Sequence, residues 1–101
     1  MKHYVVAELD VTDESWVPEY LENVTKLVEQ SGGTYLARTS NVERFEGERD
    51  VPQLFVIIEF PSKEAAAAFY SSAEYQPYLE KRKAGASTQL VLVAGEDIAR
   101  G

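Results

Sequence analysis

The alternation of apolar and polar positions divides the chain into six elements. Four short stretches rich in β-branched and aromatic residues predict strands, at residues 3–10, 34–45, 53–60 and 88–94. The third of these is apolar almost throughout, which is typical of a strand that is covered on both faces. A polar connection from Gly47 to Pro52 precedes it and predicts a hairpin between the second and third strands.

Helical spacing marks the segments between these strands. Four aliphatic residues repeat at this spacing between residues 17 and 28, and they predict a helix that Ser15 caps and that Gly32-Gly33 ends. Ser62 is expected to cap a second helix that contains residues 65–70. A further helical segment is expected over roughly residues 73–84, ending at Gly85.

The element order β-α-β-β-α-β predicts an α+β fold of the ferredoxin-like kind, a four-stranded antiparallel sheet with its helices on one face. The third and fourth strands are apolar at both alternating sets of positions, so the second face of the sheet should also be covered. A second copy of the chain would cover it, giving a homodimer whose sheets form an α+β barrel around a cavity. The alternative is a filled interface without a cavity. We expect one domain over residues 1–95 and a polar tail over residues 96–101.

Composition and charge remove several classes of function. The 101 residues include no cysteine and one histidine, which argues against thiolate chemistry and a multi-histidine metal centre. A net charge of −7 argues against nucleic-acid binding. No run of residues suits a signal peptide or a membrane span, so we expect a cytoplasmic protein without membrane contact. No glycine-rich phosphate loop or zinc signature is present, so no cofactor or metal is expected.

An ordered set of short motifs resembles the small proteins grouped as domain of unknown function 1330, within the dimeric α+β barrel superfamily. The resemblance implies a ferredoxin-like subunit and a homodimer, and it implies no activity. The wider superfamily includes cofactor-independent monooxygenases, lactone isomerases, polyketide cyclases and haem-related enzymes. The matching pieces are Tyr4, Ala7, Gly33, Leu36-Ala37-Arg38, Glu46-Gly47, Glu59-Phe60-Pro61-Ser62, Ser72-Ala73-Glu74-Tyr75-Gln76 and Arg82.

Arg38 and Glu59 are the most distinctive candidate pair. If the hairpin is symmetric about Glu48-Arg49, Arg38 lies opposite Glu59 on one face of the sheet. Arg38 would then bind the carboxylate or enolate of a ligand, and Glu59 would act as a general base. The alternative is a salt bridge that only stabilises the subunit or the dimer interface.

Four further side chains complete the candidate site. Glu8 shares a strand face with Tyr4, and both are expected to contact a ligand unless Glu8 is a solvated charge at the end of its strand. His3 is a third catalytic candidate, with a surface or interface position as the alternative. Tyr75 would place its hydroxyl at the pocket, unless it only packs against the sheet.

Two residues near these candidates are expected to be structural. Arg82 should hold the short helix through a carboxylate, with contact to the substrate as the alternative, and Trp16 should serve in packing.

These candidates support two functions and leave a third open. The first is a cofactor-independent isomerase or cyclase that acts on a small organic acid or aromatic compound. The second is a metabolite-binding or accessory protein without turnover. The third is a dimer with no small-molecule site.

Overall fold

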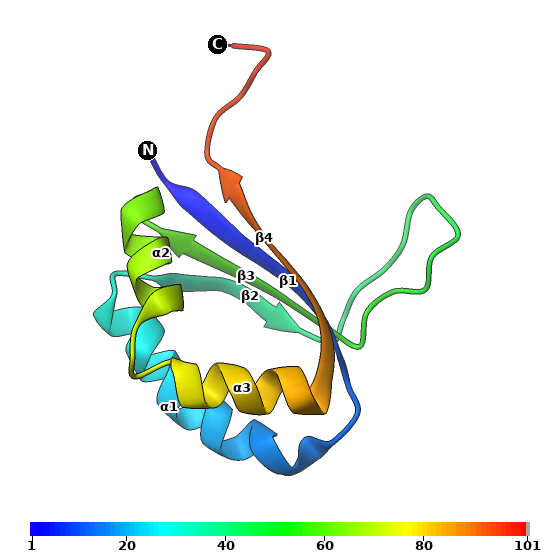
Figure 1. The fold of residues 1–101 in the computed structure, drawn as a ribbon. Helices are drawn as coiled ribbons and strands as arrows, with labels where there is room; N and C mark the ends of the chain where they lie inside the picture. Colours follow the sequence, from blue (N-terminus) through cyan, green and yellow to red (C-terminus); the bar gives the residue numbers. More distant parts are fainter. Residues whose placement is uncertain (101) are drawn as a thin grey trace.

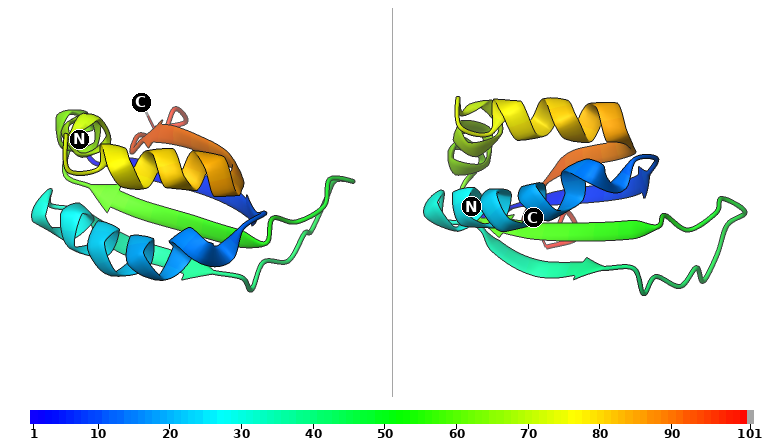
Figure 2. Two further views of the ribbon diagram at one scale, coloured as in Figure 1. Left: turned by 60° about the horizontal axis from the view of Figure 1, so that its bottom comes forward. Right: turned by 90° about the horizontal axis from the view of Figure 1, so that it is seen from below.

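The computed structural model describes residues 1–100 and places three helices on one face of a four-stranded sheet (Figures 1 and 2). The strands follow the order β2-β3-β1-β4, and every neighbouring pair is antiparallel. This arrangement confirms the predicted ferredoxin-like α+β fold. The elements are β1 (His3–Val11), α1 (Val17–Gln30), β2 (Thr34–Thr39), β3 (Leu54–Phe60), α2 (Lys63–Ser71), α3 (Gln76–Gly85) and β4 (Ala86–Ala94).

The two faces of the sheet have different surroundings. Alternate residues of β1 and β3 are buried beneath the helices, including Val5, Ile58 and Phe60. The opposite face has no covering element within the described chain, yet it remains rich in apolar side chains. On this open face Val91 is 56% exposed and Val93 is 44% exposed. The apolar character of both faces therefore matches the sequence pattern.

The first helix begins differently from the prediction. Residues 14–16 form a single 3-10 turn before α1, and Asp13 caps that turn by accepting a hydrogen bond from the backbone N–H of Ser15. Ser15 is therefore inside the turn, because the aspartate two residues earlier already supplies the acceptor. The helix ends as expected, with Gly32 in the left-handed conformation at φ 87°. The predicted cap of α2 is confirmed, since Ser62 Oγ accepts from the N–H of Ala65 at 3.0 Å.

The second strand is shorter than the prediction of residues 34–45. It ends at Thr39, and residues 40–53 form a connection that projects beyond the sheet (Figure 1). Phe45, which suggested a longer strand, is 92% exposed. Charged residues and Gly47, at φ 102°, occupy this connection and give it no apolar face to bury. A register shift between Tyr35 and Ala37 also interrupts the pairing of β2 with β3.

The C-terminal end of helix α3 lies against the 3-10 turn of residues 14–16 through one close contact. The indole Nε1 of Trp16 donates to the carbonyl oxygen of Gly85 at 3.2 Å. A Cβ atom at Gly85 would collide with this indole, so glycine is required for the close approach. Trp16 is buried, which confirms its predicted packing role. No helix within residues 1–100 is long and apolar enough to cross a membrane.

Candidate functional site

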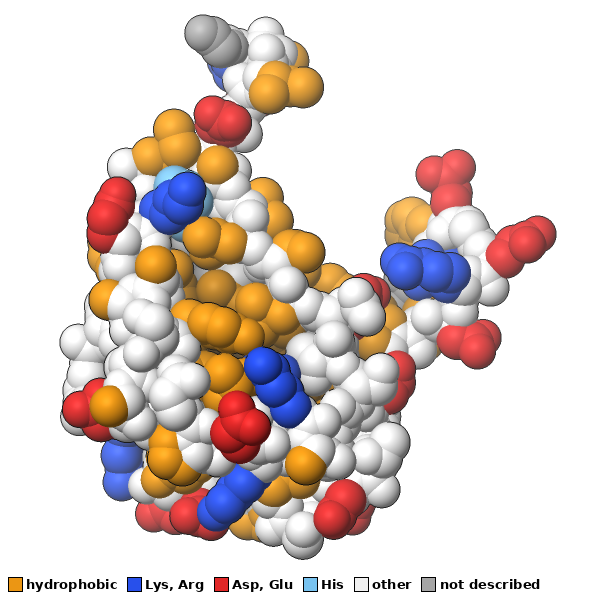
Figure 3. All heavy atoms as spheres, in the orientation of Figure 1, with side chains coloured by type: hydrophobic (Ala, Val, Ile, Leu, Met, Phe, Trp, Pro, Cys, Tyr) orange, Lys and Arg blue, Asp and Glu red, His pale blue; other side chains and the backbone are white. Residues whose placement is uncertain are grey.

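A cavity of about 100 Å³ lies between the sheet and the three helices. Figure 3 shows hydrophobic side chains gathered in the hollow between the strands and α3. All four strands and the helices α1 and α2 contribute apolar side chains to the wall, among them Val5, Leu9, Val24, Val28, Ile58 and Phe69. The cavity thus lies on the helix side of the sheet, whereas the sequence placed it between two open sheet faces.

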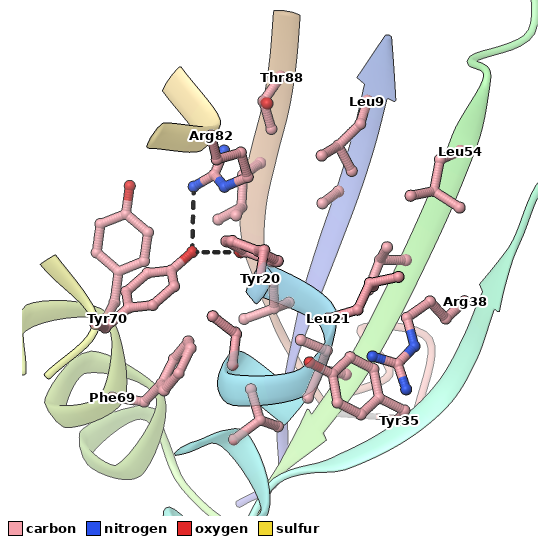
Figure 4. A pocket seen from close by; sticks show the side chains of 18 of the residues that line it. Leu9, Tyr20, Leu21, Tyr35, Arg38, Leu54, Phe69, Tyr70, Arg82 and Thr88 are labelled. Carbon is pink, nitrogen blue, oxygen red and sulfur yellow. Dashed lines mark hydrogen bonds between the residues drawn. The ribbon is translucent and has the colours of Figure 1, made fainter. Parts of the chain in front are cut away.

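A short chain of hydrogen bonds forms the polar end of this cavity (Figure 4). The hydroxyl groups of Tyr20 on α1 and Tyr75 before α3 lie 2.7 Å apart. Nη2 of Arg82 donates to the same Tyr75 hydroxyl at 3.3 Å. Two segments that are distant in sequence, helix α1 and the region from Tyr75 to Arg82, therefore meet at the Tyr75 oxygen. The predicted position of Tyr75 at a pocket agrees with this geometry, and its ring is also part of the core.

The two phenols together retain one hydroxyl proton for a further acceptor. Each phenol has one O–H group, and the contact between Tyr20 and Tyr75 uses only one of the two protons. Burial raises the pKa of Tyr20 far above its ordinary value, and the neighbouring Tyr75 adds to the shift. Tyr20 is therefore a neutral hydrogen-bond donor at physiological pH. An oxygen atom of a bound molecule would be a suitable acceptor.

Arg82 is the one charged residue in the buried set, with an exposed fraction of 4%. The sequence predicted a carboxylate partner, and this prediction is wrong: none of the ion pairs among residues 1–100 includes Arg82. Its Nε has no hydrogen-bond partner. Burial acts to lower the pKa of Arg82, but the oxygens of Tyr75 and Tyr20 offset this and the net shift is upward. The guanidinium is therefore charged inside a mostly apolar wall.

Arg38 lines the cavity at some distance from Arg82, beside Tyr35 and Leu21 (Figure 4). Its guanidinium carbon lies 3.8 Å from the centroid of the Tyr35 ring, and Nη1 donates to Oγ1 of Thr25 at 2.7 Å. Burial raises the pKa of Tyr35, and Arg38 lowers it by a smaller amount. Arg38 therefore connects β2 to α1 at an exposed position.

The predicted pairing of Arg38 with Glu59 is wrong. Arg38 is opposite Val56, and Glu59 is opposite Thr34, so the hairpin is not symmetric about Glu48-Arg49. Arg38 belongs to the helix side of the sheet, whereas Glu59 is on the open face. There Oε1 of Glu59 forms an ion pair with Nζ of Lys2 at 3.3 Å.

Three other predicted site residues also lie away from the cavity. Tyr4 is opposite Glu59 on the open face, and Glu8 is opposite Phe55 on the same face. His3 is half-buried at the start of β1, and its Nδ1 lies 3.2 Å from the carbonyl oxygen of Met1. The structure therefore separates the predicted site into two groups, with only Arg38 and Tyr75 on the cavity wall.

Two polar cavity residues were absent from the sequence-based set of site residues. Tyr20 lies within the helix predicted over residues 17–28, and Thr88 begins the last predicted strand, but neither was a candidate for the site. Arg82 did carry a signal, since it lies seven residues after Tyr75 and three after the buried Leu79. This spacing places a cation on the apolar face of a helix. No three His, Asp or Glu side chains in the described chain lie together in a way that could hold a metal ion.

Comparison with known proteins gives a family and a fold. The family described as domain of unknown function (DUF1330) matches residues 2–96. A protein of unknown function from Rhodopseudomonas palustris has 14% identity and a TM-score of 0.75, over 95% of this chain and 83% of that chain. SnoaB, a cofactor-independent oxygenase from Streptomyces nogalater, has 12% identity and a TM-score of 0.65, over 99% and 98%.

A dimeric ferredoxin-like protein of unknown function from Thermobifida fusca is a third similar structure. It has 10% identity and a TM-score of 0.54, over 93% of this chain and 91% of that chain. At these identities the likeness shows the fold alone. No curated protein matches the chain.

Proposed function

The chain belongs to the family of domain of unknown function 1330, and on that basis we propose that each subunit of a homodimer binds a small, largely apolar organic molecule in its internal cavity. The proposed chemistry is cofactor-independent, such as isomerisation or cyclisation of a small organic acid or aromatic compound. The observation that carries the proposal is the apolar cavity with one polar end, where Tyr20 and Tyr75 meet. A cavity of this design fits a molecule with one polar group on an apolar body.

The phenol pair supports chemistry at a carbonyl or enol oxygen. Negative charge that develops on such an oxygen is stabilised by a hydrogen-bond donor already fixed in a site from which water is excluded. Tyr20 and Tyr75 have one proton free for this purpose, and the contact between them fixes their orientation. SnoaB, which shares this fold, is described as a cofactor-independent oxygenase, and this supports chemistry without a cofactor as the class to test.

The open sheet face supports the homodimer. Leu36, Val91 and Val93 are each more than two-fifths exposed on this face, and an apolar surface of this kind is typical of an interface. The protein from Thermobifida fusca is described as a dimeric ferredoxin-like protein. In a dimer formed through this face, Tyr4, Glu8 and Glu59 would lie at the interface. Among the predicted site residues, Tyr75 and Arg38 then remain as contacts of the ligand.

Binding without turnover is the second candidate function. One observation favours it: among the described residues, the cavity wall includes no aspartate, glutamate or histidine that could act as a general base. Incubation of the protein with a binding compound, followed by mass spectrometry of the products, distinguishes the two functions. Turnover that disappears in Tyr20→Phe would support the enzyme, and unchanged compound would support the binding protein.

Filling the cavity tests the proposal directly. Ala66 is buried and lines the cavity, whereas its neighbour Ala67 on α2 is exposed, so Ala66→Leu and Ala67→Leu form a matched pair. A molecule that binds only the folded state raises its melting temperature. Toluene should raise the melting temperature of the unmodified protein and of Ala67→Leu, but not that of Ala66→Leu. An equal rise in all three proteins would show that the cavity is not the binding site.

A further inference from the structure

We infer that the ligand is a monocarboxylate, and that its carboxylate is held by Arg82 and Thr88 at the polar end of the cavity. This inference rests on the proposed function, because it names the class of molecule that the same cavity accepts. It assigns to Arg82 the role of binding the ligand, in place of the structural ion pair expected from the sequence. It also assigns a role to Thr88, whose hydroxyl has no other explanation in the fold.

The unpaired charge of Arg82 is the first observation. A buried cation without a counter-ion is expensive, because the lost hydration is not replaced. Arg82 has an exposed fraction of 4%, and within residues 1–100 its only hydrogen bond is the 3.3 Å contact from Nη2 to the hydroxyl of Tyr75. Its Nε–H has no hydrogen-bond partner among the described residues. The missing partner is an anion, and the cavity is the space that remains for it.

Thr88 supplies the second, independent observation. Its Oγ1 is buried without a hydrogen-bond partner, and it is one of only two such side-chain atoms within residues 1–100; the other is Nε of Arg82. Thr88 extends from β4 toward the same end of the cavity as Arg82 (Figure 4). Buried polar atoms nearly always have hydrogen-bond partners. Two unpaired polar atoms beside one cavity therefore indicate a ligand group that would form hydrogen bonds with both.

The donor pattern identifies the chemistry of that group. Arginine can only donate, and both Thr88 and the phenol pair have a hydroxyl proton to give. A carboxylate has only acceptor atoms, and its two oxygens suit the planar fork of a guanidinium. A neutral amide would direct an N–H₂ group at these donors. The geometry therefore favours a carboxylate over an amide of the same shape.

The cavity wall limits the rest of the molecule. Apart from this polar end, and from Arg38 and Tyr35 on β2, the lining is apolar, so the remainder of the ligand should be largely hydrocarbon. A volume of about 100 Å³ is below the roughly 150 Å³ of an engineered cavity that accepts benzene. The hydrocarbon part of the ligand should therefore be a short branched chain, or a single ring that extends toward the open side of the cavity.

A second hollow connects Arg82 to the surface. It has a volume of about 340 Å³ and is lined by Tyr70, Arg82, Lys83, Ala86, Thr88 and Leu90. Four of these residues, Tyr70, Arg82, Thr88 and Leu90, also line the inner cavity. Arg82 and Thr88 therefore lie between the outer hollow and the inner cavity. The protein carries a net charge of −7, but Arg82 and Lys83 line this outer hollow. Their positive charges make the hollow a locally favourable route for an anion.

The position of Arg82 in α3 does not explain its burial. A cation near the C-terminus of a helix is stabilised by the helix dipole, and Arg82 and Lys83 both lie in the last turn. Lys83 has the same favourable interaction with the helix dipole while its side chain is exposed. The dipole therefore accounts for a positive charge in this turn, but not for an unpaired Nε–H beneath the surface.

Calorimetric titration with matched probes tests the inference. Isobutyrate and benzoate are compared with isobutyramide and benzamide, which keep the shape and remove the charge. The carboxylates should bind the unmodified protein about tenfold more tightly than the amides, or better. Equal affinity for acid and amide would overturn the carboxylate site and leave the cavity proposal standing. Binding of inorganic phosphate as tight as that of isobutyrate would also overturn it, by showing an anion site without apolar selectivity.

Three variants assign the effect to residues. Arg82→Met should reduce the ratio of acid to amide affinity to about one, and Thr88→Val should lower it by a smaller factor. Lys81→Met, which removes the same charge from an exposed position on α3, should leave the ratio unchanged. A ratio that survives in both Arg82→Met and Thr88→Val would refute the assignment. If no probe binds, toluene included, the proposed function itself fails.

Discussion

Replacing Arg82 with methionine should stabilise the ligand-free protein, although most buried substitutions destabilise. The expectation follows from the unpaired charge: the guanidinium is buried, has one hydrogen bond and lacks a carboxylate partner. Methionine keeps the length of the side chain and is apolar, so it fills the same space without a desolvation cost. Tyr75 keeps a partner, because Tyr20 remains 2.7 Å away.

The magnitude follows from three opposing contributions. Removing the charge recovers several kcal/mol of desolvation. The change loses one charged hydrogen bond, about 1.5–3 kcal/mol, and a helix-dipole contribution of about 0.3–1 kcal/mol. The balance is a gain of about 1–3 kcal/mol in the free energy of unfolding. For a chain of this size that gain raises the melting temperature by about 4 °C or more.

Urea denaturation at equal protein concentration, in buffer without carboxylates, measures this change. Lys81→Met is the control, because it removes an exposed ion pair with Glu19 that contributes about 0–1 kcal/mol. Carboxylate buffers are excluded because a bound anion would stabilise only the protein that retains Arg82. A loss of more than about 1 kcal/mol in Arg82→Met, relative to Lys81→Met, would refute the reasoning and indicate a structural role.

Three further changes test other parts of the account. Ile57→Glu places a charge on the open face and should yield a folded monomer of 11.3 kDa by light scattering; an intact dimer would contradict the interface. Tyr20 retains its proton in the folded state at pH values where the unfolded chain loses it, so stability should fall above about pH 10 by up to about 1.4 kcal/mol per pH unit. Tyr20→Phe should remove this contribution to the slope of the free energy of unfolding against pH, measured by urea denaturation between about pH 9 and pH 11. An unchanged slope would argue against a buried, protonated Tyr20. Gly85→Ala inserts a methyl group against the indole of Trp16 and should cost about 1–3 kcal/mol in thermal unfolding, whereas an unchanged melting temperature would argue against the contact.

The architecture was predictable because the strands carry their own local signals. The apolar run from Leu54 to Phe60 and the cap at Ser62 are short-range features, and the structure has both. The element order then leaves few topologies open. The end of the second strand was not predictable in this way, since Val42 and Phe45 have β propensity but find no partner strand.

The site was only partly predictable, because its geometry depends on register and on long-range contacts. The assumption of a symmetric hairpin placed Arg38 opposite Glu59, but Glu59 is opposite Thr34, and the irregularity between Tyr35 and Ala37 also puts Arg38 on the other face. Tyr20 and Arg82 meet through Tyr75 across 55 and 7 residues of sequence, respectively. Tyr75 and Arg82 lie at helical spacing, so that half of the site was visible in the sequence. The contribution of Tyr20 and Thr88 required the packed fold.

The Nε–H resonance of Arg82 in a nitrogen–proton correlation spectrum tests the central claim most directly. This proton is buried and unpaired in the free protein, so its signal reports on whatever acceptor arrives. Addition of isobutyrate should shift the Arg82 signal in a saturable way, while isobutyramide leaves it in place and the signal of Arg44, exposed in the connection over residues 40–53, changes little. An Arg82 signal that does not respond to isobutyrate at saturation of the cavity, or that responds equally to the amide, would contradict a carboxylate held by Arg82.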